Sequence, residues 1–410
     1  MPINTPASSE SVCMPEIDSA ESKSNSSHRM IFLWAFLLSV LHLSLLFAAS
    51  FFFTLEEPPA EAITPPQKAM VILAEESPRW ARAWYHWDSL WLVHLARYGY
   101  RLEILPDGRL WNSNVAFLPG LPTIARLIEL TGLNPWAGLL FFNLSAAFLF
   151  RYGLGRLSLE ISGSQRASIA SMLALTVWPW HFFLIAPYQE SAGMAAVVWS
   201  LWFVRQNKLI PAFLLAMAAS LFRLTSIGLF AGLFAGASAA VLFDRTRWRE
   251  SLSIIIATAG CFTGWQGLML YFRYEFGDGQ IGIKVQQAWG RDMPHLSGPF
   301  ESLASVFTGT LTGHAWLDWL ASVFVLISVY FVWRELGIIW ASGLFMLVAQ
   351  ALSTGMVVSS GRYMLTAIPL FITGGILAER RPKVFYPLFV FSLLLQLMLL
   401  WRFGHGLFGG

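Results

Sequence analysis

The sequence predicts an all-α polytopic membrane protein, and three features point there. Hydrophobic residues make up 56% of the 410-residue chain and charged residues only 12%, which leaves too little polar surface for a soluble protein of this length. The 19 tryptophans suit positions at the boundary between acyl chains and water. About 11 apolar stretches follow one another along the chain. The net charge of +3 gives no support to nucleic-acid binding.

The N-terminal segment, residues 1–28, is rich in Ser, Glu and Lys and poor in aromatic residues. That composition predicts a disordered cytoplasmic tail. Met30–Phe53 follows as the first apolar stretch, and it is long enough to cross a bilayer, which takes about 20 residues. No small-residue cleavage site follows it, so we interpret it as a retained span and not as a signal peptide. Residues 29–410 are predicted to form a single transmembrane domain.

Residues 54–134 are predicted to form a first outer loop with juxtamembrane helices. In Trp80–Tyr100, aromatic residues recur at helical spacing and fall on one face. This pattern is typical of a helix lying flat at a membrane interface, and it places Asp88 at the margin of the aromatic face. Val115–Leu130 is short for a span and contains two prolines, so we interpret it as a second juxtamembrane helix.

The other apolar stretches complete the predicted membrane domain, and several are shorter than a full span. Short stretches indicate tilted or broken helices. The stretches lie near 135–154, 167–186, 188–204, 209–222, 225–243, 251–272, 316–333, 336–357, 363–378 and 384–402.

The basic residues predict how these spans are oriented. With a cytoplasmic N-terminus, the five short inner connections hold twelve of the 27 basic residues, the excess that the positive-inside rule requires of short inner loops. The short outer turns hold only Arg223 and Arg362. Trp80–Tyr100, Glu190 and a second outer loop, residues 273–315, then share the outer side with these arginines. The inner basic residues lie near 151–166, 205–208, 245–249, 334 and 380–383.

Asp88 is the candidate catalytic residue. Its neighbours on the predicted helix are bulky and aromatic, and a carboxylate held against aromatic rings loses hydration and becomes a stronger base. The alternative is a solvated acid on an amphipathic helix. Arg223 and Arg362 each end a span on the outer side, where a guanidinium can fork onto phosphate oxygens. The alternative for both arginines is snorkelling to lipid headgroups.

Glu190 lies at a Pro-broken turn between two spans and is either a second acid in the cleft or a helix cap. The loop 273–315 contains FGDGQIG, which is no nucleotide fingerprint because no strand precedes it. We expect this loop to cover the cleft, where Asp278, Trp289 and Arg291 would hydrogen-bond or stack on a sugar; ordinary loop structure is the alternative. No metal or other cofactor is predicted, since no His, Asp or Glu pair recurs at a spacing suited to a metal.

Five segments add a resemblance to these observations. In chain order they are HWDSLWLVHLARYGY, NVAFLPGLP, APYQES, YFRYEFGDGQIGIKVQQAWGR and SSGRYMLTAIP. Together they resemble the PIG-V-like mannosyltransferases, the family of the second GPI mannosyltransferase and its bacterial relatives. Each motif is short, but all five occur in the same order between about residue 80 and residue 370. Members often have an arginine before the Trp-Asp pair, where this chain has His86.

The resemblance implies a fold of the GT-C superfamily, which has large outer loops above a bundle of membrane spans. It also implies transfer of mannose or a related hexose from a polyprenyl-phosphate donor to a hydroxyl of a glycan, lipid or protein acceptor on the outer face. The catalytic role falls on Asp88. The same motifs make His86, Trp87, Tyr188 and Tyr363 candidate substrate contacts.

Two other classes of function stay open at this point. A sugar or lipid transporter, or a flippase, would place charged groups near the bilayer midplane, often in two repeated halves. A non-catalytic partner subunit of another transferase would need no active site. The expected location is the bacterial cytoplasmic membrane, with the endoplasmic reticulum membrane as the alternative, and the lipids of that membrane are expected partners.

Overall fold

The computed structural model describes residues 16–55, 57–244, 248–309, 311, 313 and 315–407. Within these ranges the chain is helical and contains no named strand; Ile104 and Leu110 form one isolated bridge. The α-helices are α1 (Glu16–Ser50), α2 (Pro65–Glu76), α3 (Arg79–Arg82), α4 (Asp88–Tyr98), α5 (Gly120–Leu130), α6 (Pro135–Ser162), α7 (Gln165–Thr176), α8 (Glu190–Arg205), α9 (Leu209–Phe222), α10 (Thr225–Phe243), α11 (Trp248–Phe276), α12 (Ile281–Lys284), α13 (Gly298–Ala304), α14 (Ala315–Leu336), α15 (Ile338–Leu352), α16 (Ser360–Tyr363), α17 (Ile368–Arg380) and α18 (Pro382–Gly404). The 3-10 helices are η1 (Asn114–Ala116), η2 (His181–Leu184), η4 (Val285–Trp289) and η5 (Met364–Thr366).

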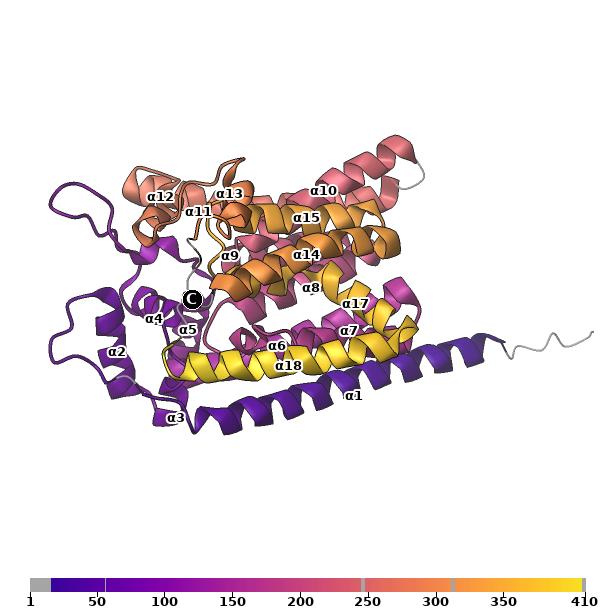
Figure 1. Cartoon of the computed structure of the whole chain (residues 1–410), viewed down its shortest axis with the longest axis horizontal. Helices are drawn as coiled ribbons and strands as arrows, with labels where there is room; N and C mark the ends of the chain where they lie inside the picture. Colours follow the sequence, from indigo (N-terminus) through magenta and orange to yellow (C-terminus); the bar gives the residue numbers. More distant parts are fainter. Residues whose placement is uncertain are drawn as a thin grey trace, which may run out of the picture.

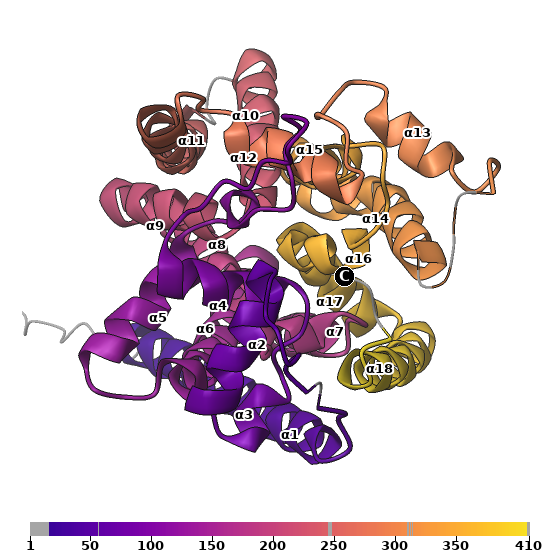
Figure 2. The ribbon, with the colours of Figure 1, turned by 90° about the vertical axis from the view of Figure 1, so that its left-hand side faces the viewer.

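The long helices lie side by side in a bundle (Figure 1). The short helices α2 to α5, together with α12 and α13, gather at one end of this bundle, which we call the cap end (Figures 1 and 2). Helix α1 starts at the opposite end and runs toward the cap end. Helix α18 finishes at the cap end too, where the Thr54 amide donates to the Gly404 carbonyl at 2.8 Å.

Six of the described helices are long and apolar enough to cross a membrane: α1 from Ser26, α6, α10, α11, α14 and α18. A seventh is added if α16–η5 and α17 are one span, bent by 77°. The remaining predicted stretches also contain helices, but these are shorter, between the 12 residues of α7 and the 16 residues of α8. The protein is therefore an all-helical membrane protein with several shortened helices.

Helices α10 and α15 pack closely because small residues line their contact. A side chain at Gly232 or Gly236 of α10 would collide with the backbone of α15. Small residues at this spacing let two membrane helices approach until their backbones touch. This contact holds α10 against α15, and α10 begins two residues after Arg223.

Two expectations for the first part of the chain differ from the structure. Helix α1 begins at Glu16, inside the segment predicted to be a disordered tail, and residues 1–15 of that tail lie outside the described residues. The predicted continuous helix Trp80–Tyr100 is two helices, α3 and α4. They are separated by a turn in which Trp87 has a positive φ of 46°.

The physical reason for this break is burial. Trp84 is only 3% exposed and packs against Phe53 and Phe403 of the bundle, while the Tyr85 hydroxyl donates to the Trp136 carbonyl at 2.7 Å. The aromatic residues anchor the cap end to the bundle instead of forming one continuous flat face. Tertiary packing thus overrides the helical periodicity of this segment. In contrast, the predicted juxtamembrane helix in 115–130 is present as η1 and α5.

The end opposite the cap carries ion pairs between helices. Arg205 at the end of α8 pairs with Glu250 of α11 at 3.2 Å, and Arg380 at the end of α17 pairs with Glu335 of α14 at 2.7 Å. The basic residues at 245 and 247 that the orientation argument counted lie outside the described residues. These two helix ends and their basic residues thus lie at the end of the bundle opposite the cap. Arg151, which the orientation argument also counted, lies instead inside α6, where it is buried and donates to the Thr176 hydroxyl at 2.9 Å.

Candidate functional site

A cleft of about 410 Å³ lies at the cap end. The start of α4, the start of α8, the junction of α9 with α10, the η4 segment and α16 all contribute to its walls. Its wall is polar near Asp88, Glu190 and Arg362 and apolar along α9, α10 and α11. The apolar wall consists of Phe222, Leu224, Ile227, Trp265, Leu268 and Phe272.

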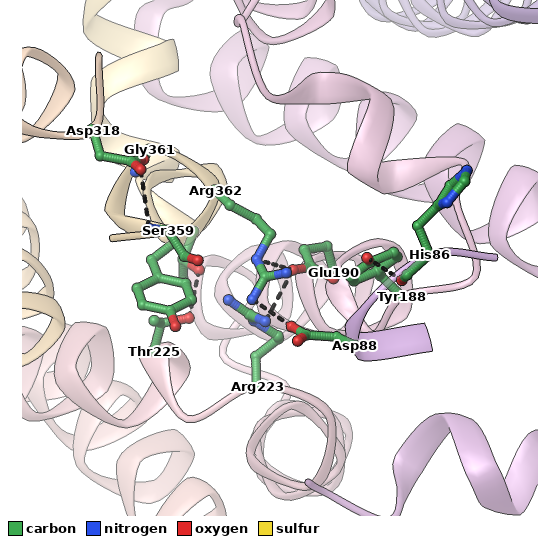
Figure 3. Close-up of polar contacts among 12 residues, drawn as sticks. His86, Asp88, Tyr188, Glu190, Arg223, Thr225, Asp318, Ser359, Gly361 and Arg362 are labelled. Atoms are coloured by element: carbon green, nitrogen blue, oxygen red, sulfur yellow. Dashed lines mark hydrogen bonds and ion pairs between the residues drawn. The ribbon is translucent and has the colours of Figure 1, made fainter. Parts of the chain in front are cut away.

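Asp88 is the first residue of α4, and its side chain is 26% exposed at the cleft. The helix N-terminus favours a negative charge at this position. Two hydrogen bonds hold the preceding turn, because the Tyr188 hydroxyl and the Ser89 hydroxyl both donate to the His86 carbonyl, at 2.6 and 2.8 Å. Asp88 Oδ2 lies 2.8 Å from Nη2 of Arg362 (Figure 3).

Arg362 projects from the short helix α16, which a buried acid holds in place. Both oxygens of Asp318 accept backbone N–H groups, Oδ2 from Ser359 at 3.0 Å and Oδ1 from Gly361 at 2.8 Å (Figure 3). Ser359 has a positive φ of 69°, which the two hydrogen bonds to Asp318 compensate. On the other side, the Trp178 indole donates to the Gly361 carbonyl at 3.0 Å. The turn that presents Arg362 is therefore fixed from both sides.

Glu190 joins the two arginines. It lies in the first turn of α8, with Gln189 as the N-cap, and its side chain is 2% exposed. Its Oε1 lies 2.9 Å from Nη1 of Arg223 and 3.2 Å from Nε of Arg362. The sequence left two interpretations open for Glu190, an acid in the cleft or a helix cap. In the structure Glu190 lines the cleft. Asp88, Arg362, Glu190 and Arg223 form one continuous chain of ion pairs (Figure 3).

Tyr363 lies where three guanidinium groups meet. The centre of its ring is 5.1 Å from the guanidinium carbon of Arg223 and 5.5 Å from those of Arg291 and Arg362. Arg291 also donates a hydrogen bond to the Tyr363 hydroxyl. Contacts of this kind with an aromatic ring stabilise cations. The positive charge of the cleft is therefore concentrated around Tyr363.

No family model matches the chain, and no curated protein matches it. The site is therefore interpreted from its own geometry. Among the described residues, no group of three or more His, Cys, Asp or Glu side chains could hold a metal ion. The cleft thus offers the carboxylates of Asp88, Glu190 and Asp292, several guanidinium groups and an apolar wall.

Part of the loop 273–315 lies at the cleft, where the sequence predicts it. Trp289 and Arg291 line it, and the Trp289 ring meets the ring of Phe117 edge to face, with centroids 6.0 Å apart. Gln286 donates to the Ala116 carbonyl at 3.2 Å and ties this loop to residues 54–134. The two segments therefore meet at the same cleft.

Eight predicted site residues line the cleft: Asp88, Tyr188, Glu190, Arg223, Trp289, Arg291, Arg362 and Tyr363. Asp278 does not. It lies in the turn after α11 and pairs with Lys284 at 2.6 Å, and the hydrogen bond from this lysine holds the pKa of Asp278 below its usual value. Its side chain belongs to the loop structure that was the alternative interpretation.

His86 and Trp87 do not line the cleft either. The His86 ring is buried, with Nε2 3.1 Å from the Ala83 carbonyl, and burial lowers the pKa of His86 to about 4. Trp87 packs edge to face on Phe403, with ring centroids 5.3 Å apart. The backbone of His86 still contributes to the site, because its carbonyl accepts the hydrogen bonds that hold the turn before Asp88.

Sequence reasoning missed two residues that build the site from within the bundle. Asp318 holds the Arg362 turn. Asn143 donates to the carbonyls of Ala186 and Tyr188, at 2.6 and 2.9 Å, and so holds the turn before Glu190. The signal was present for both, since each is a polar residue inside an apolar stretch. Intramembrane polar residues are functional or structural candidates by default because burying them is costly.

Proposed function

We propose that the protein is an inverting glycosyltransferase of the GT-C type with eleven membrane spans. It would move mannose or a related hexose from a polyprenyl-phosphate donor to an acceptor hydroxyl on the non-cytoplasmic face. The observation that carries this proposal is the convergence of Asp88, Arg362 and Arg223 on one cleft. These residues lie far apart in the sequence, and the sequence predicts a role in the site for each of them separately.

In the proposed reaction, the acceptor hydroxyl attacks the anomeric carbon while Asp88 takes its proton. The bond from that carbon to the phosphate oxygen breaks on the opposite face, so the configuration inverts and the lipid phosphate leaves with the electron pair. General-base help of this kind accelerates a reaction by about 10²–10⁴. Arg362 and Arg223 would stabilise the charge that develops on the leaving phosphate.

The apolar wall of the cleft supports a lipid donor over a soluble nucleotide sugar. Phe222, Trp265, Leu268 and Phe272 lie on α9 and α11, beside the guanidinium groups. A polyprenyl-phosphate sugar has the matching chemistry, since its singly charged phosphodiester adjoins a long apolar chain. The phosphate is a competent leaving group once it is paired with arginine, so the proposed reaction requires no metal.

The cap end is proposed to face away from the cytoplasm. Its support is the charge distribution, since basic connections meet at the other end of the bundle, which the positive-inside rule assigns to the cytoplasm. We propose the bacterial cytoplasmic membrane as the location.

The test is sugar transfer by the purified chain in detergent, with a synthetic polyprenyl-phosphate mannose and a panel of glycan, lipid and peptide acceptors. We expect transfer without a vesicle gradient or a second subunit, which separates an enzyme from a flippase or a partner protein. Asp88→Asn keeps the size of the side chain and should abolish transfer while the protein still melts cooperatively. Asp107→Asn, in an exposed hairpin at the cap end, is the matched control and should transfer normally. Near wild-type turnover by Asp88→Asn would remove this residue from the mechanism.

A further inference from the structure

We propose that Glu190 is a positioning residue that holds Arg223 and Arg362 side by side as a clamp for one phosphate group. With both guanidinium groups held, Arg362 is able to exchange Asp88 for the phosphate when the donor binds. This inference rests on the proposed function and adds to it a role for an acid that has no part in the chemistry of transfer. Glu190 acts only through the two arginines.

The first observation is that one oxygen serves both arginines. Glu190 Oε1 is within 2.9 Å of Arg223 and 3.2 Å of Arg362, and the side chain is almost completely buried. Asn143 fixes the turn that leads to Glu190, and the first turn of α8 favours its negative charge. The carboxylate is therefore held firmly in one position.

The second observation is electrostatic. Two guanidinium groups that approach the same oxygen repel each other, and this repulsion is strong where water is largely excluded. The acid between them compensates for the repulsion. Without its charge, Arg223 and Arg362 would move apart and lose the spacing at which two forked donors grip one phosphate.

The third observation is a donor without an acceptor. Arg362 lines the cleft, and its buried Nη1 has no hydrogen-bond partner among the described residues, whereas Nε, which also makes no hydrogen bond, is at least paired by charge with Glu190 at 3.2 Å. A buried polar group without a partner costs free energy, and an anion in the cleft would supply the missing acceptor. The group is thus ready for a ligand that the protein alone does not provide.

The fourth observation concerns Asp88, whose Oδ2 is paired with Nη2 of Arg362 at 2.8 Å. While Oδ2 is paired with Arg362, it is not free to take a hydrogen bond from an acceptor hydroxyl. A phosphate that takes over Nη2 frees Asp88 for the acceptor hydroxyl, while Glu190 still holds Nε of the same guanidinium. No covalent bond changes in this exchange, which links donor binding to activation of the base.

The experiment measures how a change at Glu190 alters the affinity for a phosphate ligand. A positioning role and a simple charge effect predict changes of opposite sign. Glu190→Gln makes the cleft more positive by one charge, so charge alone predicts tighter binding of an anion. The clamp predicts weaker binding, because the arginines separate. We expect the Kd for geranylgeranyl phosphate, measured by calorimetry in detergent micelles, to rise about tenfold, which corresponds to about 1.4 kcal/mol.

Glu335→Gln is the matched control. Glu335 is also ion-paired with an arginine, Arg380, but at the opposite end of the bundle, so its replacement should leave the Kd unchanged. Should Glu190→Gln fail to melt cooperatively, Glu190→Asp serves instead. It keeps the charge but draws the carboxylate back by one methylene, so the clamp predicts weaker binding where charge alone predicts no change.

The outcomes separate this inference from the proposed function. Equal or tighter binding by Glu190→Gln, or an unchanged Kd in Glu190→Asp, overturns the clamp. A wild-type chain that does not bind the prenyl phosphate overturns both the clamp and the proposed donor. If the prenyl phosphate binds and Glu190→Gln weakens it, but the wild type transfers no sugar, the clamp stands and the proposed reaction fails.

Discussion

Arg362 owes its position to residues that never reach the cleft. Asp318 is fully buried in α14, and both of its oxygens accept backbone N–H groups of the turn before Arg362. Burying a carboxylate is costly unless it is paired or hydrogen-bonded, so such a residue is retained only where it organises something else. Here it organises a turn that includes the left-handed residue Ser359. The cleft arginine and the buried acid form one structural unit.

The burial of His86 makes the free energy of unfolding depend on pH in a predictable direction. Burial lowers the pKa of His86 to about 4, against an ordinary value of about 6.5 in the unfolded chain. Between these values the unfolded chain binds a proton that the folded chain does not. The free energy of unfolding therefore falls as the pH drops from about 6.5 to about 4, by up to about 1.4 kcal/mol per pH unit from this one residue.

The measurement is the melting temperature of the detergent-solubilised protein across this pH range. In His86→Gln the side chain keeps a donor for the Ala83 carbonyl but does not titrate. We expect its melting temperature to fall less steeply on acidification than that of the wild type, with the two proteins most alike near pH 7. Parallel curves for the two proteins would contradict the prediction.

At the scale of the element, close helix packing should dominate the stability of the bundle. Gly232 of α10 faces the backbone of α15 without room for a side chain, whereas Gly267 of α11 has open space around it. Both are interior helix positions, where alanine is intrinsically more stable than glycine by about 0.5–1 kcal/mol. Alanine substitutions at the two glycines therefore distinguish the effect of helix propensity on stability from the effect of helix packing.

Gly232→Ala is expected to lower the melting temperature, because α10 and α15 must move apart. It should also reduce transfer activity, since α10 begins two residues after Arg223. Gly267→Ala is the control and should raise the melting temperature slightly without changing activity. The melting temperature and the turnover of the two variants check this. Equal values for both variants would show that α10 and α15 tolerate being moved apart.

Much of the site could be predicted from the sequence because charged residues in an apolar chain are few. Asp88, Glu190, Arg223 and Arg362 each interrupt an apolar or aromatic pattern, and that interruption identifies them. The break between α3 and α4 was not predictable in this way, since the spacing of aromatic residues is the same whether they face lipid or the bundle. Only the packing of Trp84 against the bundle decides between these environments.

Asp318 shows a different limit. Its position inside an apolar stretch was visible, but its role depends on a contact with a turn more than forty positions later in the chain. No periodicity carries such long-range information. His86 and Trp87 show the converse. Because they precede Asp88 in the sequence, they were expected to contact substrate, but His86 is buried and the partly buried Trp87 packs against the core.

At the scale of the whole molecule, the two ends of the bundle differ in kind. The cap end has a cleft, buried ion pairs and two covering loops, whereas the other end has ion pairs between helix termini and short basic connections. Helix α1 enters from the basic end and α18 leaves at the cap end (Figure 1). The chain therefore passes along the bundle an odd number of times, and both loops of the cleft lie at the cap end.

The orientation of the bundle in the membrane can be tested by labelling single cysteines. In a background with Cys13 and Cys261 replaced by Ser, a cysteine at Asp107 reports on the cap end and one at Lys383 on the basic end. Because basic connections are retained in the cytoplasm, a membrane-impermeant maleimide should label Asp107→Cys in intact spheroplasts and Lys383→Cys only after permeabilisation. The reverse pattern would place the cleft in the cytoplasm, where a lipid-phosphate sugar presented at the outer leaflet could not reach Asp88. Labelling of both positions in intact cells would instead show that the parity of the spans is even.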